Sequence, residues 1–213
     1  MIRNLIFDFD GTLADTSLGI VRCTQVTLET MGLPLSTPER ICATIGLPLA
    51  DCFARGTDTP AERIEEACAT YRRLFNDIAV PCIVLFPGVA ETLAALDARG
   101  FRMSIATSRG SRSLQMLLER MGVAGHFCAS AASDTVSRHK PEPDPALYVL
   151  EKMGGKPEES LVIGDTTFDI RMGQAAGCRT CGVTWGNQDR AQLQAASPDW
   201  ILDRIEALPG ILG

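Results

Sequence analysis

The chain has 213 residues, of which 46% are hydrophobic and 22% are charged, and it carries a net charge of −6. These proportions are ordinary for a globular protein that buries one good core plus a smaller unit. The acidic balance argues against nucleic acid or an anionic membrane as a partner, because no basic stripe is available to contact phosphate groups. No apolar run is long enough to span a bilayer and the first residues lack a signal-peptide pattern, so we expect a cytoplasmic protein.

Eight cysteines are scattered along the chain, and only Cys178 and Cys181 stand at the spacing of a CxxC motif. A single such pair without a second one is a weak signal for metal or redox chemistry. We therefore interpret the cysteines as reduced thiols, with a metal or redox role for this pair as the alternative.

The first chemically informative stretch is the apolar run 5–9, which contains Asp8 and leads into Asp10 and Gly11. Such a run closed by a turn predicts a buried strand, and residues two apart on a strand share a face, so Asp8 and Asp10 should point the same way. Two carboxylates about 4 Å apart repel by roughly 4 kcal/mol at an effective dielectric near 20, so a metal ion or lysine is expected nearby. The alternatives are a solvated Asp/Gly turn and a calcium loop, and the latter fails because the required oxygen ligands are missing.

Residues 16 to about 80 show helical rather than strand periodicity. Proline and serine or threonine caps, glycine stops and apolar residues at helical spacing predict four helices. We expect them at about 20–31, 38–45, 49–54 and 60–78. The sequence therefore predicts an all-helical cap domain, residues 15–81, inserted into a core domain that comprises residues 1–14 and 82–213.

From Pro87 onward the pattern alternates between helix and strand, which predicts a parallel sheet with helices on both faces. We expect further strands at 101–106, 126–129, 161–163 and 180–183, with an edge strand at 200–202. Helices are expected at 89–99, 114–121, 145–153 and 168–176, with a short one at the end of the chain. The predicted fold class is α/β, with a Rossmann-like, doubly wound parallel sheet of five or six strands.

Polar residues follow several of these strands, and in a doubly wound sheet the ligand lies beyond the carboxyl ends of the strands. The candidates are Asp8 and Asp10 after the first strand, Thr107 and Ser108 after the second, Lys140 in the loop before the helix at 145–153, and Asp165 and Asp169 after the strand at 161–163. Each residue taken alone has a plainer explanation. Ser108 would cap the following helix, Lys140 would be a solvated loop residue, and Asp169 would be an exposed charge at a helix start. All of these explanations would have to hold together, which favours a common site.

The ordered set of motifs resembles the haloacid dehalogenase superfamily of hydrolases, and the resemblance covers the whole chain. The motifs are Asp8-Phe9-Asp10-Gly11-Thr12, Ser108 in Ala106-Thr107-Ser108, Lys140, and Gly164-Asp165 with Asp169. The helical insert directly after the first motif, together with the stretches 173–177 and 183–186, is similar to the phosphoglycolate phosphatase-like branch. The resemblance implies the core fold of that superfamily with an inserted helical cap.

The resemblance also implies a Mg²⁺-dependent phosphatase that acts on a small phosphorylated metabolite, such as phosphoglycolate or a sugar phosphate. Asp8 would be the nucleophile that forms an aspartyl-phosphate, and Asp10 the general acid and base. The family pattern places Mg²⁺ at Asp8, Asp10, Asp165 and Asp169. It places the substrate phosphate at Gly11, Thr107, Ser108 and Lys140.

Other functions within and outside this superfamily are less consistent with the sequence. Dehalogenating members lack the second aspartate, here Asp10, and phosphonoacetaldehyde hydrolases need a cap lysine, whereas residues 15–85 contain none. A sugar-phosphate mutase of the β-phosphoglucomutase type is the main alternative, although both histidines lie outside the cap. A non-catalytic phosphate-binding protein would be expected to have lost Asp8, Asp10 or Lys140.

Three cap residues are candidates for substrate specificity: Arg40, Gly46 and Leu47. They would reach the leaving group when the cap closes. Their alternative interpretation is an exposed helix surface followed by a helix-ending Gly-Leu-Pro turn. The sequence leaves monomer and homodimer equally open.

Overall fold

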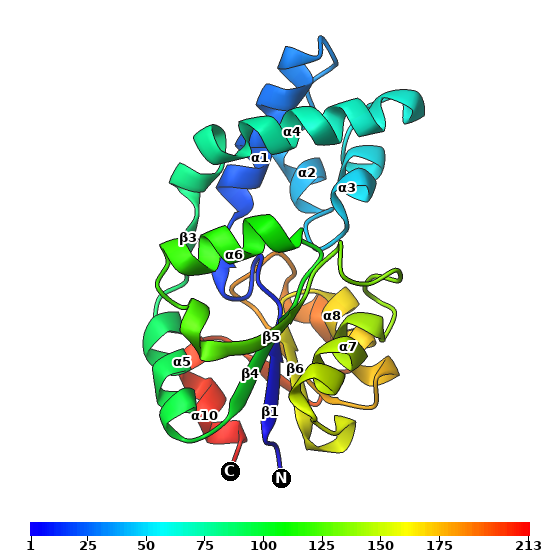
Figure 1. Cartoon of the computed structure of the whole chain (residues 1–213). Coiled ribbons are helices and arrows are strands. Elements are labelled where there is room, and N and C mark those ends of the chain that lie inside the picture. The colour runs from blue at the N-terminus through cyan, green and yellow to red at the C-terminus, as the bar shows by residue number, and fades with distance from the viewer.

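A six-stranded parallel sheet forms the centre of the computed structural model, which describes all residues 1–213 (Figure 1). The strand order is β5-β4-β1-β6-β7-β8, so the order reverses beside β1, where a doubly wound sheet binds its ligands. The predicted α/β fold is thus confirmed, with the edge strand as the sixth member of the sheet. The strands are β1 (Asn4–Phe7), β4 (Arg102–Ala106), β5 (Phe127–Ala131), β6 (Ser160–Gly164), β7 (Arg179–Val183) and β8 (Trp200–Leu202).

Helices cover both faces of this sheet because successive side chains of each strand point to opposite faces. On β1, Leu5 and Phe7 pack with α5, α6 and α10, whereas Ile6 packs on the other face with α7 and α8. The central strand is buried on both faces, as its continuous apolar run predicts. The helices of this unit are α5 (Val89–Ala98), α6 (Ser111–Arg120), α7 (Asp144–Met153), α8 (Thr167–Ala175), α9 (Arg190–Gln194) and α10 (Leu208–Ile211).

The segment between β1 and α5 forms a second, helical unit above the carboxyl ends of the strands, at the end of the molecule opposite the two termini (Figure 1). Its helices are α1 (Ser17–Thr30), α2 (Pro38–Cys42), α3 (Leu49–Gly56) and α4 (Ile64–Ile78). Helix α4 buries Tyr71 and Phe75, and these residues belong to the same hydrophobic cluster as Leu5 and Phe7 of the sheet. The two units therefore share one continuous core.

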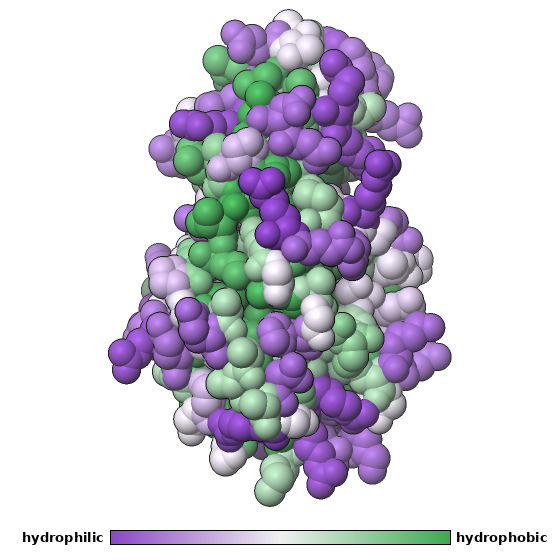
Figure 2. Space-filling model, turned by 60° about the vertical axis from the view of Figure 1, so that its left-hand side comes forward, coloured by the Kyte–Doolittle hydropathy of each residue, from purple (hydrophilic) through white to green (hydrophobic).

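Hydrophobic residues also reach the surface where the two units meet. Figure 2 shows them as a green strip that runs from the helical unit down to the sheet-bearing unit, between more hydrophilic ends. None of the helices is both long and apolar enough to cross a membrane.

The chain passes between the units through two short strands that the sequence does not reveal. β2 (Ala14–Asp15) and β3 (Val84–Leu85) pair antiparallel, so the two connections run side by side. Each strand has only two residues, too few for an alternating pattern to be recognised. The sequence also does not reveal the small α9 or four short 3-10 turns, which are Val80–Cys82, Ala124–His126, Pro157–Glu159 and Ile205–Ala207. A fifth turn, Ala61–Arg63, occupies the first residues of the helix expected at 60–78, so α4 begins only at Ile64.

One helix is shorter than its pattern suggests. α2 ends at Cys42 instead of continuing to Ile45, so the expected helical end was wrong. The hydroxyl of Thr44 donates to the carbonyl of Ile41 at 2.7 Å, and Gly46 has a positive φ of 102°. Residues 44–48 consequently form a loop, which we call the cap loop, rather than a helical surface.

Candidate active site

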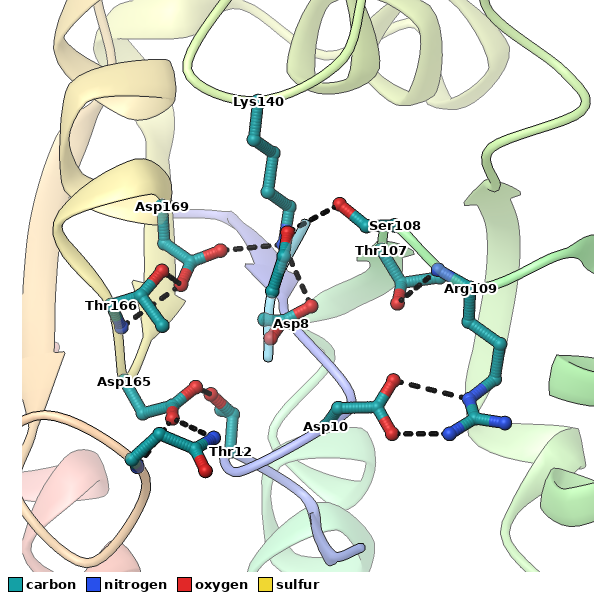
Figure 3. Close-up of polar contacts among 12 residues, drawn as sticks. Asp8, Asp10, Thr12, Thr107, Ser108, Arg109, Lys140, Asp165, Thr166 and Asp169 are labelled. Carbon is teal, nitrogen blue, oxygen red and sulfur yellow. Dashed lines mark hydrogen bonds and ion pairs between the residues drawn. The ribbon is translucent and has the colours of Figure 1, made fainter. Parts of the chain in front are cut away.

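The residues singled out at the strand ends lie together at the carboxyl end of β1 and of its two neighbours, β4 and β6 (Figure 3). The chain leaves the sheet after Asp8, whose N–H still donates to Ile163 of β6 at 2.8 Å. It then curls back, because the N–H of Gly11 donates to Ala14 and that of Ala14 donates to Phe9. Asp10 is therefore held by a loop, not by the strand alternation from which its direction was predicted.

Asp8 and Lys140 form a buried ion pair, with Lys140 Nζ 2.7 Å from Asp8 Oδ1. The same ammonium group is 2.5 Å from Asp169 Oδ1, so the lysine bridges two carboxylates. Its side chain is only 1% exposed, which excludes the explanation of Lys140 as a solvated loop residue. Burial alone would lower the pKa of Lys140, but Asp169 and Asp8 outweigh it and raise that pKa above its ordinary value. The lysine is held in its charged form.

Asp169 occupies the first turn of α8 and is completely buried. Its second oxygen, Oδ2, accepts hydrogen bonds from the backbone N–H and the hydroxyl of Thr166, at 3.1 and 2.6 Å, in a capping box. The explanation of Asp169 as an exposed helix-start charge is thereby excluded. The helix start fixes the direction of this carboxylate toward Lys140.

Asp165 follows β6 and is also fully buried. The Thr12 hydroxyl donates to one oxygen at 3.0 Å, while the backbone and side-chain N–H groups of Asn187 donate to the other at 2.8 Å each. Burial, and next the charge of Asp169, raise the pKa of Asp165 to about 6. Asn187 was missed in the sequence because it stands in a polar loop after β7 without a recognisable motif.

The glycines around Asp165 allow an unusually close approach of the backbone. A Cβ atom at Gly11 would lie 2.2 Å from Asp165 Oδ2, and Gly11 has a positive φ of 86°. A Cβ atom at Gly186 would lie 2.4 Å from the same oxygen. Larger residues at either position would push Asp165 out of place.

The three buried carboxylates of Asp8, Asp165 and Asp169, which we call the carboxylate cluster, fit a divalent cation. One oxygen of each lies within 4.8 Å of the others. Asp8 Oδ2 is buried and has no hydrogen-bond partner, although it is an ionisable oxygen next to Lys140. Burial raises the pKa of Asp8 well above its ordinary value, so a cation in this cluster would favour the ionised form. Carboxylate oxygens are the ligands that Mg²⁺ and Ca²⁺ prefer. The side chain of Asp10 is not part of this cluster.

The carboxylate of Asp10 instead forms an ion pair with Arg109. The guanidinium donates from Nε to Asp10 Oδ2 at 3.1 Å and from Nη2 to Asp10 Oδ1 at 2.5 Å, so each carboxylate oxygen accepts one hydrogen bond from Arg109 (Figure 3). Arg109 was missed in the sequence. A single arginine after a strand resembles any solvated loop residue, and its only signal is its position directly after Thr107-Ser108.

The two hydroxyl residues after β4 have different surroundings. Thr107 is buried, and its hydroxyl accepts a hydrogen bond from the N–H of Arg109 at 3.2 Å. Ser108 donates to the carbonyl of Gly46 in the cap loop at 2.6 Å. Helix α6 starts at Ser111 with Gly110 as its N-cap, so the explanation of Ser108 as a helix cap does not hold. Ser108 therefore joins the two units of the molecule at the cavity.

A cavity of about 550 Å³ lies between the sheet and the helical unit. Asp8, Asp10, Thr107 and Ser108 line it from below, and Gly46 and Leu47 line it from the cap loop. Arg40 does not line it. Its guanidinium pairs with Asp58 at 2.8 Å, and both side chains are largely exposed. The structure thus brings two of the three candidate cap residues to the cavity and leaves Arg40 outside it.

Comparisons with known proteins agree with this architecture. A model of the family described as haloacid dehalogenase-like hydrolase matches residues 5–183. The "Probable phosphatase IndB" of Dickeya dadantii is 36% identical over 97% of this chain and 91% of its own. The phosphoglycolate phosphatase of Escherichia coli K12 is 32% identical over 100% of this chain and 93% of its own. A solved haloacid dehalogenase-like hydrolase from Bacteroides fragilis superimposes with a TM-score of 0.92, at 32% identity, over 98% of this chain and 100% of its own.

The chain belongs to the haloacid dehalogenase-like hydrolase family. Within that family it is an enzyme of the phosphatase type, similar to the phosphoglycolate phosphatases. The predicted family resemblance and the predicted enzyme class, a phosphoric monoester hydrolase, are both confirmed.

Proposed function

We propose that this phosphatase hydrolyses a small phosphate monoester with Mg²⁺ as its cofactor, through an aspartyl-phosphate on Asp8. The observation that carries the proposal is the state of the Asp8 carboxylate. One of its oxygens is bound by Lys140 at 2.7 Å, while the other is buried without a partner and faces no competing donor. A carboxylate that is oriented on one side and unpaired on the other is suited to attack a phosphorus atom.

In the first step Asp8 Oδ2 attacks phosphorus, and the bond from phosphorus to the ester oxygen breaks. Lys140 is beside Asp8 and would hold the phosphoryl oxygens, together with the hydroxyl of Thr107 and the backbone N–H of Ser108. The backbone N–H groups of Gly11 and Thr107 already donate to Ala14 and Ala131, so Gly11 would contribute the close approach of its backbone and not a donor. Each well-placed donor of this kind contributes roughly 3–4 kcal/mol to the transition state. Asp10 protonates the departing alkoxide.

In the second step Asp10 takes a proton from a water molecule, and this water attacks phosphorus. The bond between phosphorus and Asp8 breaks, so inorganic phosphate leaves and the carboxylate is restored. A difficult displacement is thereby divided into two easier ones, each in line.

Mg²⁺ would be held by Asp8, by Asp165, by the backbone carbonyl of Asp10 and, directly or through water, by Asp169. When bound, it neutralises charge on Asp8 and on the phosphoryl group. The grouping of three buried carboxylates, with one oxygen of each within 4.8 Å of the others, supports this assignment.

The proposed substrate is a small phosphorylated metabolite, with phosphoglycolate or a sugar phosphate as the first candidates. The phosphoglycolate phosphatases among the relatives and the moderate size of the cavity support this class. We propose residues 15–81 as a cap over a core of residues 1–14 and 82–213, with Gly46 and Leu47 near the leaving group. A mutase is disfavoured because neither histidine lies in the cap, and His126 pairs with Asp97 at 3.1 Å. The cytoplasmic location stays a prediction.

The experiment is phosphate release from a panel of small phosphate monoesters by the wild type and Asp8→Asn, with Mg²⁺ and with a chelator. The panel includes phosphoglycolate, several sugar phosphates and p-nitrophenyl phosphate. We expect release only from the wild type with Mg²⁺. Equal activity of Asp8→Asn, or no release from any ester, would contradict the proposal.

A further inference from the structure

Arg109 is a buried cation at the edge of the cavity, and the proposed reaction steps do not use it. Its side chain is only 8% exposed. Its guanidinium lies 5.7 Å from the ring centroid of Phe9 in the sheet unit and 5.0 Å from that of Phe75 in helix α4. It therefore stands at the junction of the two units, where the end of the substrate remote from Asp8 would be enclosed.

Two buried cations lie on different sides of Asp8: Lys140, which does not line the cavity, and Arg109, which does (Figure 3). Lys140 is already bound to Asp8 and Asp169 beside the nucleophile, which is where the transferred phosphoryl group must lie. Arg109 forms an ion pair with Asp10, the residue that would protonate the leaving oxygen. Arg109 is thus placed next to the alcohol portion of the ester and not next to its phosphoryl group.

The ion pair between Arg109 and Asp10 competes with the proposed role of Asp10 in the first step. Each oxygen of Asp10 accepts one hydrogen bond from Arg109 and keeps one further lone pair. A general acid must carry a proton, however, and a neutral carboxyl group is a weaker partner for a guanidinium than a carboxylate is. A buried guanidinium loses much free energy if it gives up a carboxylate without a replacement, so the substrate has to supply the new partner.

We propose that Arg109 binds a second anionic group on the leaving alcohol of the substrate and exchanges Asp10 for it. The replacement has to be planar or multidentate, because the guanidinium presents two parallel donors; a carboxylate or a phosphate fits. A substrate with an uncharged alcohol offers no such partner and leaves Asp10 tied to Arg109. Two exposed arginines at the cavity, Arg72 and Arg112, add positive charge that favours entry of a doubly anionic ester.

This inference rests on the proposed phosphatase function and narrows its substrate class to esters with two separated anionic groups. The test compares phosphoglycolate with 2-hydroxyethyl phosphate, which has a similar length but no second charge, and uses the full chain with Mg²⁺. The wild type is expected to prefer phosphoglycolate in kcat/KM by roughly 10- to 100-fold, the usual range for one charge-assisted bidentate contact. In Arg109→Gln the preference should fall to within a few-fold, chiefly through a higher KM for phosphoglycolate.

Two further variants separate recognition from folding. Arg109→Lys keeps the charge but not the two parallel donors, so it should recover part of the preference. Arg179→Gln removes an arginine whose carboxylate partner, Asp199, is remote from the cavity, and it should keep the full preference. Circular dichroism checks that each variant is folded. If Arg109→Gln does not fold, the test rests on the wild-type ratio of kcat/KM for phosphoglycolate and 2-hydroxyethyl phosphate.

The inference is wrong if the wild type hydrolyses both esters equally well, or if folded Arg109→Gln keeps the wild-type preference. In either case release of p-nitrophenol from p-nitrophenyl phosphate still supports the phosphatase proposal. If the wild type hydrolyses none of the three esters, the proposed function fails and this inference fails with it.

Discussion

The carboxylate cluster, which reaches the cavity through Asp8, and the cap loop, which lines the cavity, are held in place by different means. Asp8, Asp165 and Asp169 stand at the ends of adjacent strands or in the first turn of a helix, and buried hydrogen bonds fix each of them. The cap loop contacts the sheet unit through one hydrogen bond, from Ser108 to Gly46. The difference suggests that the chemistry is built into the sheet, whereas substrate choice depends on a cap loop that is held less firmly. The following predictions test that division, from the largest expected effect to the smallest.

Lys140→Met should produce the largest loss. The variant removes the only cation among the buried carboxylates and leaves their charges uncompensated, which costs about 3–5 kcal/mol in buried ion pairs. Urea denaturation in chelator measures this loss, and kcat should fall by roughly a hundredfold or more because a phosphoryl ligand is gone. Added Mg²⁺ should restore part of the stability but not the activity. A variant as stable as the wild type in chelator would show that the cluster does not need its lysine.

Asp165 should make the stability of the protein depend on pH and on metal together. Its pKa is raised to about 6 in the folded protein, above the ordinary value near 4 in an unfolded chain. Without metal the folded state holds a proton that the unfolded chain releases, so this group's contribution to stability falls as pH rises from about 4 to about 6. A divalent cation needs the ionised carboxylate, so stabilisation by Mg²⁺ should be large at neutral pH and weak near pH 5.

The measurement is the midpoint of thermal unfolding with Mg²⁺ and with chelator, at both pH values. Asp165→Asn, which keeps the shape but not the charge, should lose most of the response to Mg²⁺ at either pH. An undiminished response in this variant would place the metal elsewhere.

Ser108→Ala should have a moderate effect confined to kinetics. The lost hydrogen bond to Gly46 joins the cap loop to the sheet unit, and a neutral bond of this kind is worth about 0.5–1.5 kcal/mol. We expect kcat/KM to fall by roughly 2- to 10-fold while the unfolding midpoint changes little. A loss as large as that of Lys140→Met would instead indicate a direct phosphate contact by the Ser108 hydroxyl.

Arg40→Ala should have the smallest effect of the four. Arg40 pairs with Asp58 on the surface of the helical unit, outside the cavity, and exposed pairs contribute roughly 0–1 kcal/mol. Steady-state kinetics on the preferred ester should stay within about twofold of the wild type. A large rise in KM would indicate that Arg40 contacts the substrate and would contradict its position outside the cavity.

The contrast between the sheet and the cap loop also explains which site residues could be predicted from the sequence. Apolar runs such as 5–9 and 161–163 predicted their strands, and the rule that parallel strands bind ligands at their carboxyl ends then brought Asp8, Lys140 and Asp165 together. Arg109 and Asn187 were missed because each is one polar residue in a loop, and its partner, Asp10 or Asp165, is far away in the sequence. Arg40 was expected near the substrate because the sequence shows a helix but not which side of it faces the cavity.

The most direct test of the central claim is to trap the covalent state of Asp8. The enzyme is mixed with its best ester and Mg²⁺ and quenched within one turnover, and any acyl phosphate is reduced with borohydride. Peptide mass spectrometry then identifies the residue at position 8. The mechanism predicts homoserine in place of Asp8 in the wild type, and none without substrate. Unmodified Asp8 in samples that released phosphate, or reduction at another carboxylate, would contradict Asp8 as the nucleophile.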